Sequence, residues 1–184
     1  MRETARELDS NGFGDVPRLM TEWNTQSQSE DWTVKWVGNE TCNQLFAGAA
    51  VCHLALSCDD LLDTMAWWVA SDVFEEGGPQ VEPYGTRYQY YGMLTIDGVP
   101  KASFHAFRFL HRMRGRRYDL PRPEEWPDTC GALMTDESSC TRLLVWNCQF
   151  PHDVAHGDLD IKVDIPLPGP MKHPGEVRVT CAQV

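Results

Sequence analysis

Polar and aromatic side chains with the chemistry of a carbohydrate site follow two apolar stretches of the chain. In "RLMTEWNTQS", the carboxylate Glu22 comes directly after a short apolar run and directly before an indole and an amide. In "MAWWVASDVFEE", two indoles precede a serine and three carboxylates. Carboxylates stabilise positive charge at an anomeric carbon, amides bind hydroxyl groups, and an indole stacks on the apolar face of a sugar ring. These residue types therefore favour a sugar site, provided that the two stretches meet in space.

The two stretches meet if both are strands of one parallel sheet. Apolar periodicity predicts helices and strands in alternation: a helix over 2–9, a strand over 16–23, a helix over 41–56, a strand over 61–72 and a helix over 100–113. This order is typical of parallel α/β units. In parallel α/β barrels the chemistry gathers at the carboxyl ends of the strands, which is where the carboxylates of both stretches lie.

The composition changes after Gly115. A proline-rich connector, "RPEEWPD", leads into runs of strand length at 140–150, 159–167 and 176–184, with no evident helix between them. The sequence therefore predicts an α/β unit over 1–119 and a small β-rich unit over 120–184. The basic residues from Arg108 to Arg117 are interpreted as the solvated face of the preceding helix rather than as an anion site.

Charge and composition exclude several classes of partner. The formal net charge of −11 argues against nucleic acid or an anionic membrane surface, because both require a basic face. No apolar run approaches the roughly 20 residues that span a bilayer. None of the seven cysteines forms a CxxC pair, so we expect no metal site, and Cys52 and Cys58 are interpreted as small buried residues. The first residues lack the apolar core of a signal peptide, so the sequence assigns no localisation.

Three stretches of this chain resemble the later part of glycoside hydrolase family 39, most of all its β-xylosidase branch. They are "VPRLMTEWNTQS", "MAWWVASDVFEEGGP" and "YYGMLTIDGVPKASFHAFRFLHRM". The branch has a T-E-[YW]-N segment on its seventh barrel strand, a tryptophan and S-D-x-F-E-E at its eighth, and G-x-L-T-x-x-G-x-P-K-P at the next helix entry. The resemblance covers roughly residues 2–113. It implies α/β structure: about two strands and flanking helices from the C-terminal part of a TIM (β/α)8 barrel, followed by a small β-sandwich-like module.

The resemblance also implies roles for five residues. Glu22 matches the catalytic nucleophile, Trp68 the tryptophan that stacks against the sugar, and Glu75 and Glu76 the carboxylates at the substrate rim, while Asn24 helps to shape the site. The family mechanism is retaining hydrolysis: the nucleophile attacks the anomeric carbon, and water resolves the covalent glycosyl-enzyme without a metal or organic cofactor. Because adjacent strand residues face opposite sides, at most one of the two consecutive indoles should touch a ligand.

One part of the family pattern is missing. The acid/base glutamate of the family follows an asparagine in an N-E-P segment, and this sequence has none; Asn39-Glu40 is followed by threonine. We therefore expect a fragment that lacks the acid/base half and is inactive alone, with a xyloside or related glycoside as its partner and no assigned oligomeric state. Gln28 stands where β-xylosidases often place an aromatic residue, so the sequence does not predict which sugar is the substrate. A non-catalytic carbohydrate-binding or regulatory remnant, and an incomplete gene model without an independent fold, remain as alternatives.

Overall fold

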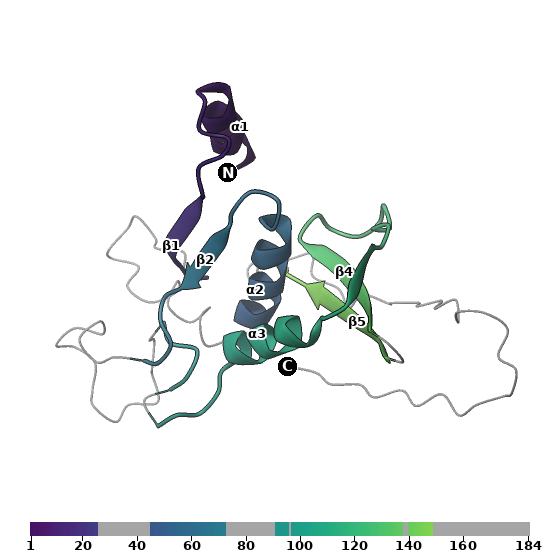
Figure 1. The fold of residues 1–184 in the computed structure, drawn as a ribbon. Coiled ribbons are helices and arrows are strands. Elements are labelled where there is room, and N and C mark those ends of the chain that lie inside the picture. The colour runs from purple at the N-terminus through teal and green to yellow at the C-terminus, as the bar shows by residue number, and fades with distance from the viewer. Residues whose placement is uncertain (26–44, 73–90, 96, 138–139, 149–184) are drawn as a thin grey trace, which may run out of the picture.

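The computed structural model describes residues 1–25, 45–72, 91–95, 97–137 and 140–148 (Figure 1). Within these ranges the chain forms three helices and five strands: α1 (Arg2–Ser10), β1 (Leu19–Trp23), α2 (Leu45–Ser57), β2 (Thr64–Trp67), α3 (Ala102–Arg112), β3 (Arg116–Asp119), β4 (Cys130–Glu137) and β5 (Cys140–Asn147). The predicted alternation of helices and strands up to residue 113 is confirmed. None of the described helices is long and apolar enough to cross a bilayer.

The strands β1 and β2 are parallel neighbours, as the sequence predicts. Leu19 lies opposite Thr64, and Trp23 lies opposite Trp67. The register shifts between Met20 and Trp23, so β1 carries a bulge that places both of these side chains on one face, in the core. The other face of this sheet is exposed, and Leu19 on it is 60% exposed.

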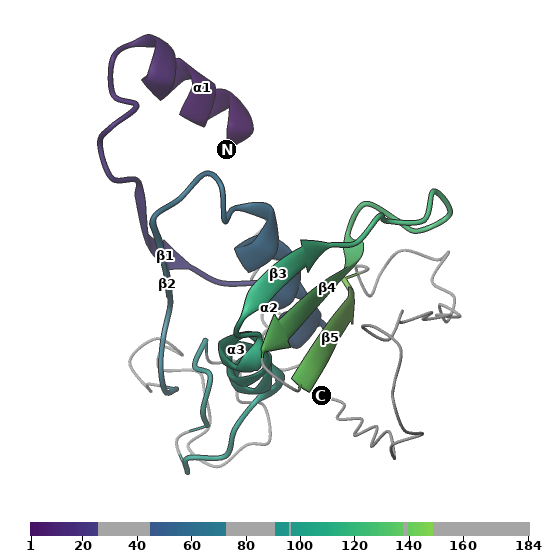
Figure 2. The ribbon, with the colours of Figure 1, turned by 45° about the vertical axis from the view of Figure 1, so that its right-hand side comes forward.

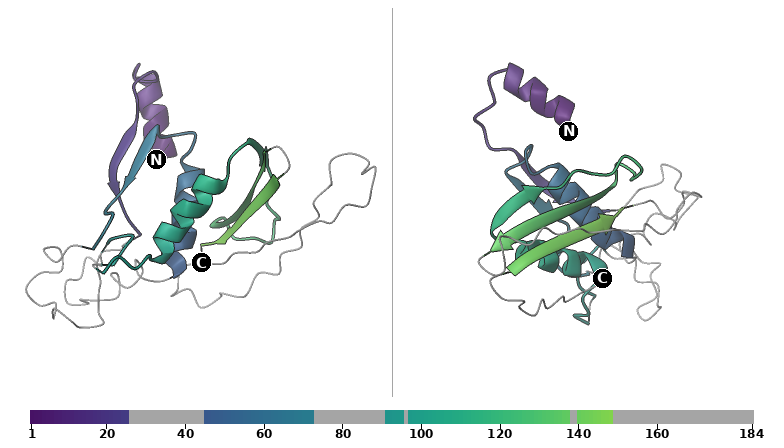
Figure 3. Two further views of the ribbon diagram at one scale, coloured as in Figure 1. Left: turned by 60° about the horizontal axis from the view of Figure 1, so that its bottom comes forward. Right: turned by 90° about the vertical axis from the view of Figure 1, so that its right-hand side faces the viewer.

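Three layers stack in the described part of the chain. The helices α2 and α3 lie side by side between the β1–β2 pair and a second sheet (Figure 3). That second sheet is antiparallel, in the order β3-β4-β5, and its three strands lie across the helices (Figure 2). Of these three strands the sequence predicts only β5.

The interpretation of Arg108–Arg117 as one helical face is wrong at its end. The helix α3 ends at Arg112, and the chain turns at Gly115, whose φ of +96° belongs to the left-handed region. A Cβ atom at this glycine would lie 2.2 Å from the Asp136 carbonyl oxygen, so the turn also requires close approach to β4. The last two arginines of the run therefore belong to a strand, β3.

One hydrophobic core joins the helices to both sheets. Its buried members are Trp23, Val51, Cys52, Ala106, Leu133 and Leu144, which come from β1, α2, α3, β4 and β5. The strand β3 lies before the boundary predicted at residue 120 and pairs with β4 beyond it. The division into two units stays a prediction, and the runs at 159–167 and 176–184 lie outside the described residues.

Truncating a core residue of β4 should destabilise the helices as well as the sheet. Leu133 is 6% exposed, whereas Leu45 at the start of α2 is 69% exposed. We expect Leu133→Ala to lower the free energy of unfolding by about 2–4 kcal/mol and Leu45→Ala by less than about 0.5 kcal/mol. Urea unfolding followed by far-ultraviolet circular dichroism and by tryptophan fluorescence measures both. Two separate transitions in the parent protein would contradict a shared core.

Cys52, Cys58 and Cys148 are buried, as the sequence predicts for the first two, and Cys52 belongs to the core described above. Desolvation, together with the nearby Cys148, raises the pKa of Cys52 to about 12, and desolvation raises that of Cys148 to about 11. Cys140, in contrast, is exposed.

Alkylation should therefore discriminate sharply between these thiols. Since the thiolate is the reacting form, we expect iodoacetamide at pH 8 to modify Cys52 and Cys148 at least about 10²-fold more slowly than Cys140. Mass spectrometry of digested samples over time measures the three rates. In urea the rates should converge, and equal rates in the native protein would show that α2 and β5 do not cover these thiols.

Candidate active site

Glu22 lies near the carboxyl end of β1, on the face that points away from α2 and α3. The bulge in β1 places Met20 and Trp23 in the core and leaves Thr21 and Glu22 exposed between them. Within the described residues, the Glu22 carboxylate makes no hydrogen bond or ion pair. The structure therefore presents this carboxylate to solvent at the strand end that the sequence predicts.

Aromatic packing holds the backbone that carries Glu22. The ring centroids of Trp23 and Trp67 lie 4.8 Å apart at 83°, an edge-to-face contact, and Phe107 of α3 completes the cluster at 6.4 Å from Trp23 and 5.9 Å from Trp67. Such contacts add to the stabilisation that burial provides. The residue after the predicted nucleophile is thus anchored in the core.

The two consecutive tryptophans face opposite sides of β2, as the alternation along a strand requires. Trp67 packs against the core, whereas Trp68 is 41% exposed. The backbone N–H of Trp68 donates to the carbonyl oxygen of Trp23 at 2.9 Å, which keeps the ends of β1 and β2 together. Trp68 is therefore the more exposed of the two indoles, and its stacking role stays a prediction.

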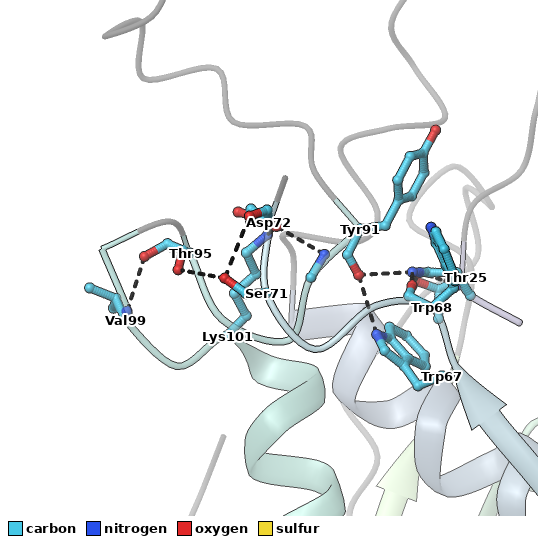
Figure 4. Close-up of polar contacts among 11 residues, drawn as sticks. Thr25, Trp67, Trp68, Ser71, Asp72, Tyr91, Thr95, Val99 and Lys101 are labelled. Atoms are coloured by element: carbon cyan, nitrogen blue, oxygen red, sulfur yellow. Dashed lines mark hydrogen bonds and ion pairs between the residues drawn. The ribbon is translucent and has the colours of Figure 1, made fainter. Parts of the chain in front are cut away.

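Asn24 joins the two strand ends to a third segment. Its Nδ2 donates to the carbonyl oxygen of Tyr91 at 2.9 Å and to that of Trp68, and its Oδ1 accepts from the backbone N–H of Thr25 at 2.7 Å. Trp67 Nε1 donates to the same Tyr91 oxygen at 3.2 Å (Figure 4). The Asn24 amide is therefore engaged with backbone groups, in agreement with a role in shaping the site.

A buried ion pair lies just beyond β2. Lys101 Nζ is 2.6 Å from Asp72 Oδ1, and the two side chains are 7% and 0% exposed. Burial raises the pKa of the Asp72 carboxyl, while the bonds from Lys101 and the Gly92 N–H oppose that rise. Sequence reasoning gave no role to Lys101; the P-K pair at the helix entry is the signal that marks this lysine.

Of the five predicted site residues, the structure joins Asn24 and Trp68 by a hydrogen bond, and Glu22 on β1 precedes Asn24 by two positions. Glu75 and Glu76 lie outside the described residues. No three His, Cys, Asp or Glu side chains in the described ranges are arranged to hold a metal ion.

An apolar pocket of about 560 Å³ lies between α1 and β1, and Glu22 is part of its wall. Neither Asn24 nor Trp68 lines it. Its lining is mostly apolar, with Leu8, Phe13 and other side chains of α1 and the following turn. A sugar needs hydrogen-bonding groups, so this pocket by itself is not the predicted sugar site.

Comparison with known families agrees with the motif resemblance. The family model described as "Glycosyl hydrolases family 39" matches residues 2–182. The chain belongs to glycosyl hydrolases family 39. The match extends beyond residue 120 as well as over the motifs around Glu22 and Trp68.

Two curated relatives of this chain are named β-xylosidases. The chain is 26% identical over 113 residues to the β-xylosidase of Caldicellulosiruptor saccharolyticus, which is 61% of this chain and 21% of the relative. It is 26% identical over 101 residues to the β-xylosidase of Geobacillus stearothermophilus, which is 55% of this chain and 18% of the relative. The chain therefore spans about a fifth of the length of the curated relatives it matches.

Solved family 39 structures share the fold. A family 39 enzyme from Xanthomonas axonopodis pv. citri matches with a TM-score of 0.60 and 22% identity, over 83% of this chain and 27% of that one. A monomeric β-xylosidase from Caulobacter crescentus matches with a TM-score of 0.63 and 20% identity over the same shares. These likenesses assign the chain to a mixed α/β fold of a TIM-barrel-containing family.

The two adjacent tryptophans should differ strongly in their contribution to stability. We expect Trp67→Ala to lower the free energy of unfolding by about 3 kcal/mol, because it empties the aromatic cluster, and Trp68→Ala by about 1 kcal/mol or less. Thermal unfolding followed by calorimetry measures the difference. Equal losses would show that Trp68, and not only Trp67, is part of the core.

Proposed function

We propose that this chain carries the nucleophile of a retaining O-glycoside hydrolase whose substrate is a β-xyloside or a related glycoside. The observation that supports the proposal best is the placement of Glu22, an exposed carboxylate near the carboxyl end of β1, beside the end of the parallel strand β2, which Trp68 directly follows. The β-xylosidase names of the relatives suggest the class of substrate.

The same proposal covers the fold. The parallel pair β1–β2, with α1, α2 and α3, forms the C-terminal part of a (β/α)8 barrel, and the region after it forms a β-sandwich-like module. In favour of this, the face of the sheet that points away from α2 and α3 carries exposed apolar side chains: Leu19 is 60% exposed, and Val16, just before the strand, is 53% exposed. In a closed barrel the corresponding face is packed inside.

In the proposed reaction, a Glu22 carboxylate oxygen attacks the anomeric carbon of the bound sugar. The bond from that carbon to the leaving-group oxygen breaks, and a glycosyl ester of Glu22 forms. Trp68 stacks on the ring, Glu75 and Glu76 bind its hydroxyl groups, and Asn24 holds the strand ends in register around the nucleophile. Water then resolves the ester and releases the sugar.

The proposed mechanism also needs a proton donor about 5–5.5 Å from the nucleophile. The family places that acid in an N-E-P segment, which this sequence does not contain. A general acid contributes about 10²–10⁴-fold to the rate. The 184-residue chain by itself is therefore restricted to glycosides whose leaving group departs without protonation.

Covalent trapping tests the nucleophile directly. A dinitrophenyl glycoside of fluorinated xylose needs no proton donor, because dinitrophenolate leaves as the anion, and the fluorine slows release of the sugar. We expect a sugar adduct on the peptide that contains Glu22, seen by mass spectrometry together with release of dinitrophenolate. An alkyl xyloside should give no detectable product.

Two variants control this experiment. Glu22→Gln should form no adduct, whereas Glu7→Gln, on the exposed surface of α1, should react like the parent protein. An adduct on another carboxylate would exclude Glu22 as the nucleophile. Saturable binding of xylose oligomers without any adduct would instead indicate a non-catalytic sugar-binding protein.

A further inference from the structure

The buried pair of Asp72 and Lys101 has a geometry that stability alone does not explain. Removing two charges from water carries a large penalty, and a well-packed apolar pair is often as stable or more stable. In addition, Asp72 Oδ2 is buried and has no hydrogen-bond partner among the described residues. The burial of this pair is explained better by the segment that the two residues hold in position than by a gain in stability.

Both residues bind one short segment, Asp72 through its side chain and its backbone and Lys101 through its backbone. Asp72 Oδ1, which accepts from Lys101, also accepts from the backbone N–H of Gly92 at 2.9 Å. The backbone N–H of Asp72 donates to the carbonyl oxygen of Leu94, and that of Lys101 donates to the carbonyl oxygen of Met93, each at 2.9 Å. The pair thus clamps residues 92–94 between the end of β2 and the start of α3 (Figure 4).

The clamp leaves no space for a side chain at Gly92. A Cβ atom there would lie 2.2 Å from the backbone nitrogen of Asp72 and 2.4 Å from the carbonyl carbon of Ser71. Real Cβ atoms do not approach backbone atoms this closely, so the segment is pressed against the residues that follow β2.

The clamped segment continues directly into the site. The carbonyl oxygen of Tyr91 accepts from Asn24 Nδ2 at 2.9 Å and from Trp67 Nε1 at 3.2 Å. Met93 also donates its backbone N–H to the carbonyl oxygen of Val69 at 3.0 Å, one residue beyond Trp68. A continuous set of hydrogen bonds therefore runs from the start of α3 to Asn24, two residues beyond Glu22.

From this geometry we infer that Asp72 and Lys101 are positioning residues for the sugar site. They act through the segment 91–94, which fixes the positions of Asn24 and Trp68 relative to Glu22. This inference rests on the proposed function of Glu22. Neither residue of the pair touches the sugar. The pair acts by fixing the position of the Tyr91 carbonyl oxygen, which accepts hydrogen bonds from Asn24 Nδ2 and Trp67 Nε1.

The test uses a variant that removes both charges together. Asp72→Asn alone leaves a buried ammonium without a counter-charge and is expected to unfold the chain, whereas Asp72→Asn with Lys101→Met leaves no unpaired charge and keeps an oxygen for the Gly92 N–H. Lys101→Arg keeps the positive charge beside Asp72 and tests whether an arginine can replace the lysine in positioning the site. The control is Asp59→Asn with Arg117→Met, which removes an ion pair whose side chains are 63% and 43% exposed.

Two measurements are made on each variant in the 184-residue chain. The first is the rate of Glu22 labelling by the fluorinated xyloside, separated into the limiting rate and the half-saturating concentration. We expect the neutral double variant to melt near the temperature of the parent yet to lose at least about tenfold in the limiting rate, since a 1 Å misplacement costs about 10²-fold. Lys101→Arg should recover part of that rate, and the control variant should label like the parent.

The second measurement does not depend on labelling. In ¹H–¹⁵N spectra, the indole N–H of Trp67 and the side-chain amide of Asn24 should shift in the neutral double variant and stay in place in the control. Unchanged resonances, or a labelling rate equal to that of the parent, would overturn the inference. A parent chain that forms no adduct at Glu22 contradicts the proposed function instead, and the spectra then still decide whether the pair positions Asn24 and Trp67.

Discussion

The burial of Trp23 against Trp67 and Phe107 is the interaction on which the candidate site depends. This aromatic packing brings the ends of β1 and β2 to the same helix, α3. It also fixes the backbone next to Glu22, the residue before Trp23. With Met20 and Trp23 both in the core, the bulged backbone between them exposes Glu22 on the opposite face. A strand without the bulge would place Met20 and Trp23 on opposite faces, because side chains alternate.

The same structure separates groups that stabilise the fold from groups that arrange the site. The apolar core joins α2 and α3 to β4 and β5 and contains no ionised side chain. The Asp72–Lys101 pair lies outside that core, beyond the end of β2, and is buried with one carboxylate oxygen that has no hydrogen-bond partner in the described part of the chain. The pair contributes more to the positions of Asn24 and Trp68 than to the stability of the fold, because the cost of burying the two charges offsets much of their attraction.

Local patterns predict much of the fold and the general location of the site. The helical periodicity around Ala106, the apolar character of α2 and the strand-length run that ends at Trp68 all agree with the structure, because each is set by which face must be buried. The strands β3 and β4 were not predicted. In β3 the arginines continue the charge pattern of α3, and only the left-handed conformation at Gly115 separates the two elements.

The sequence by itself determined the family, the order of helices and strands up to residue 113, and the candidates Glu22, Asn24 and Trp68, because these follow from residue types at fixed spacing along the chain. Only the tertiary structure decided that the Asn24 amide binds backbone carbonyl groups and that Lys101 meets Asp72 from 29 positions away. The reason is physical. A side chain's partners across strands and helices depend on how whole elements pack, and that packing is a property of the summed buried surface rather than of any local pattern.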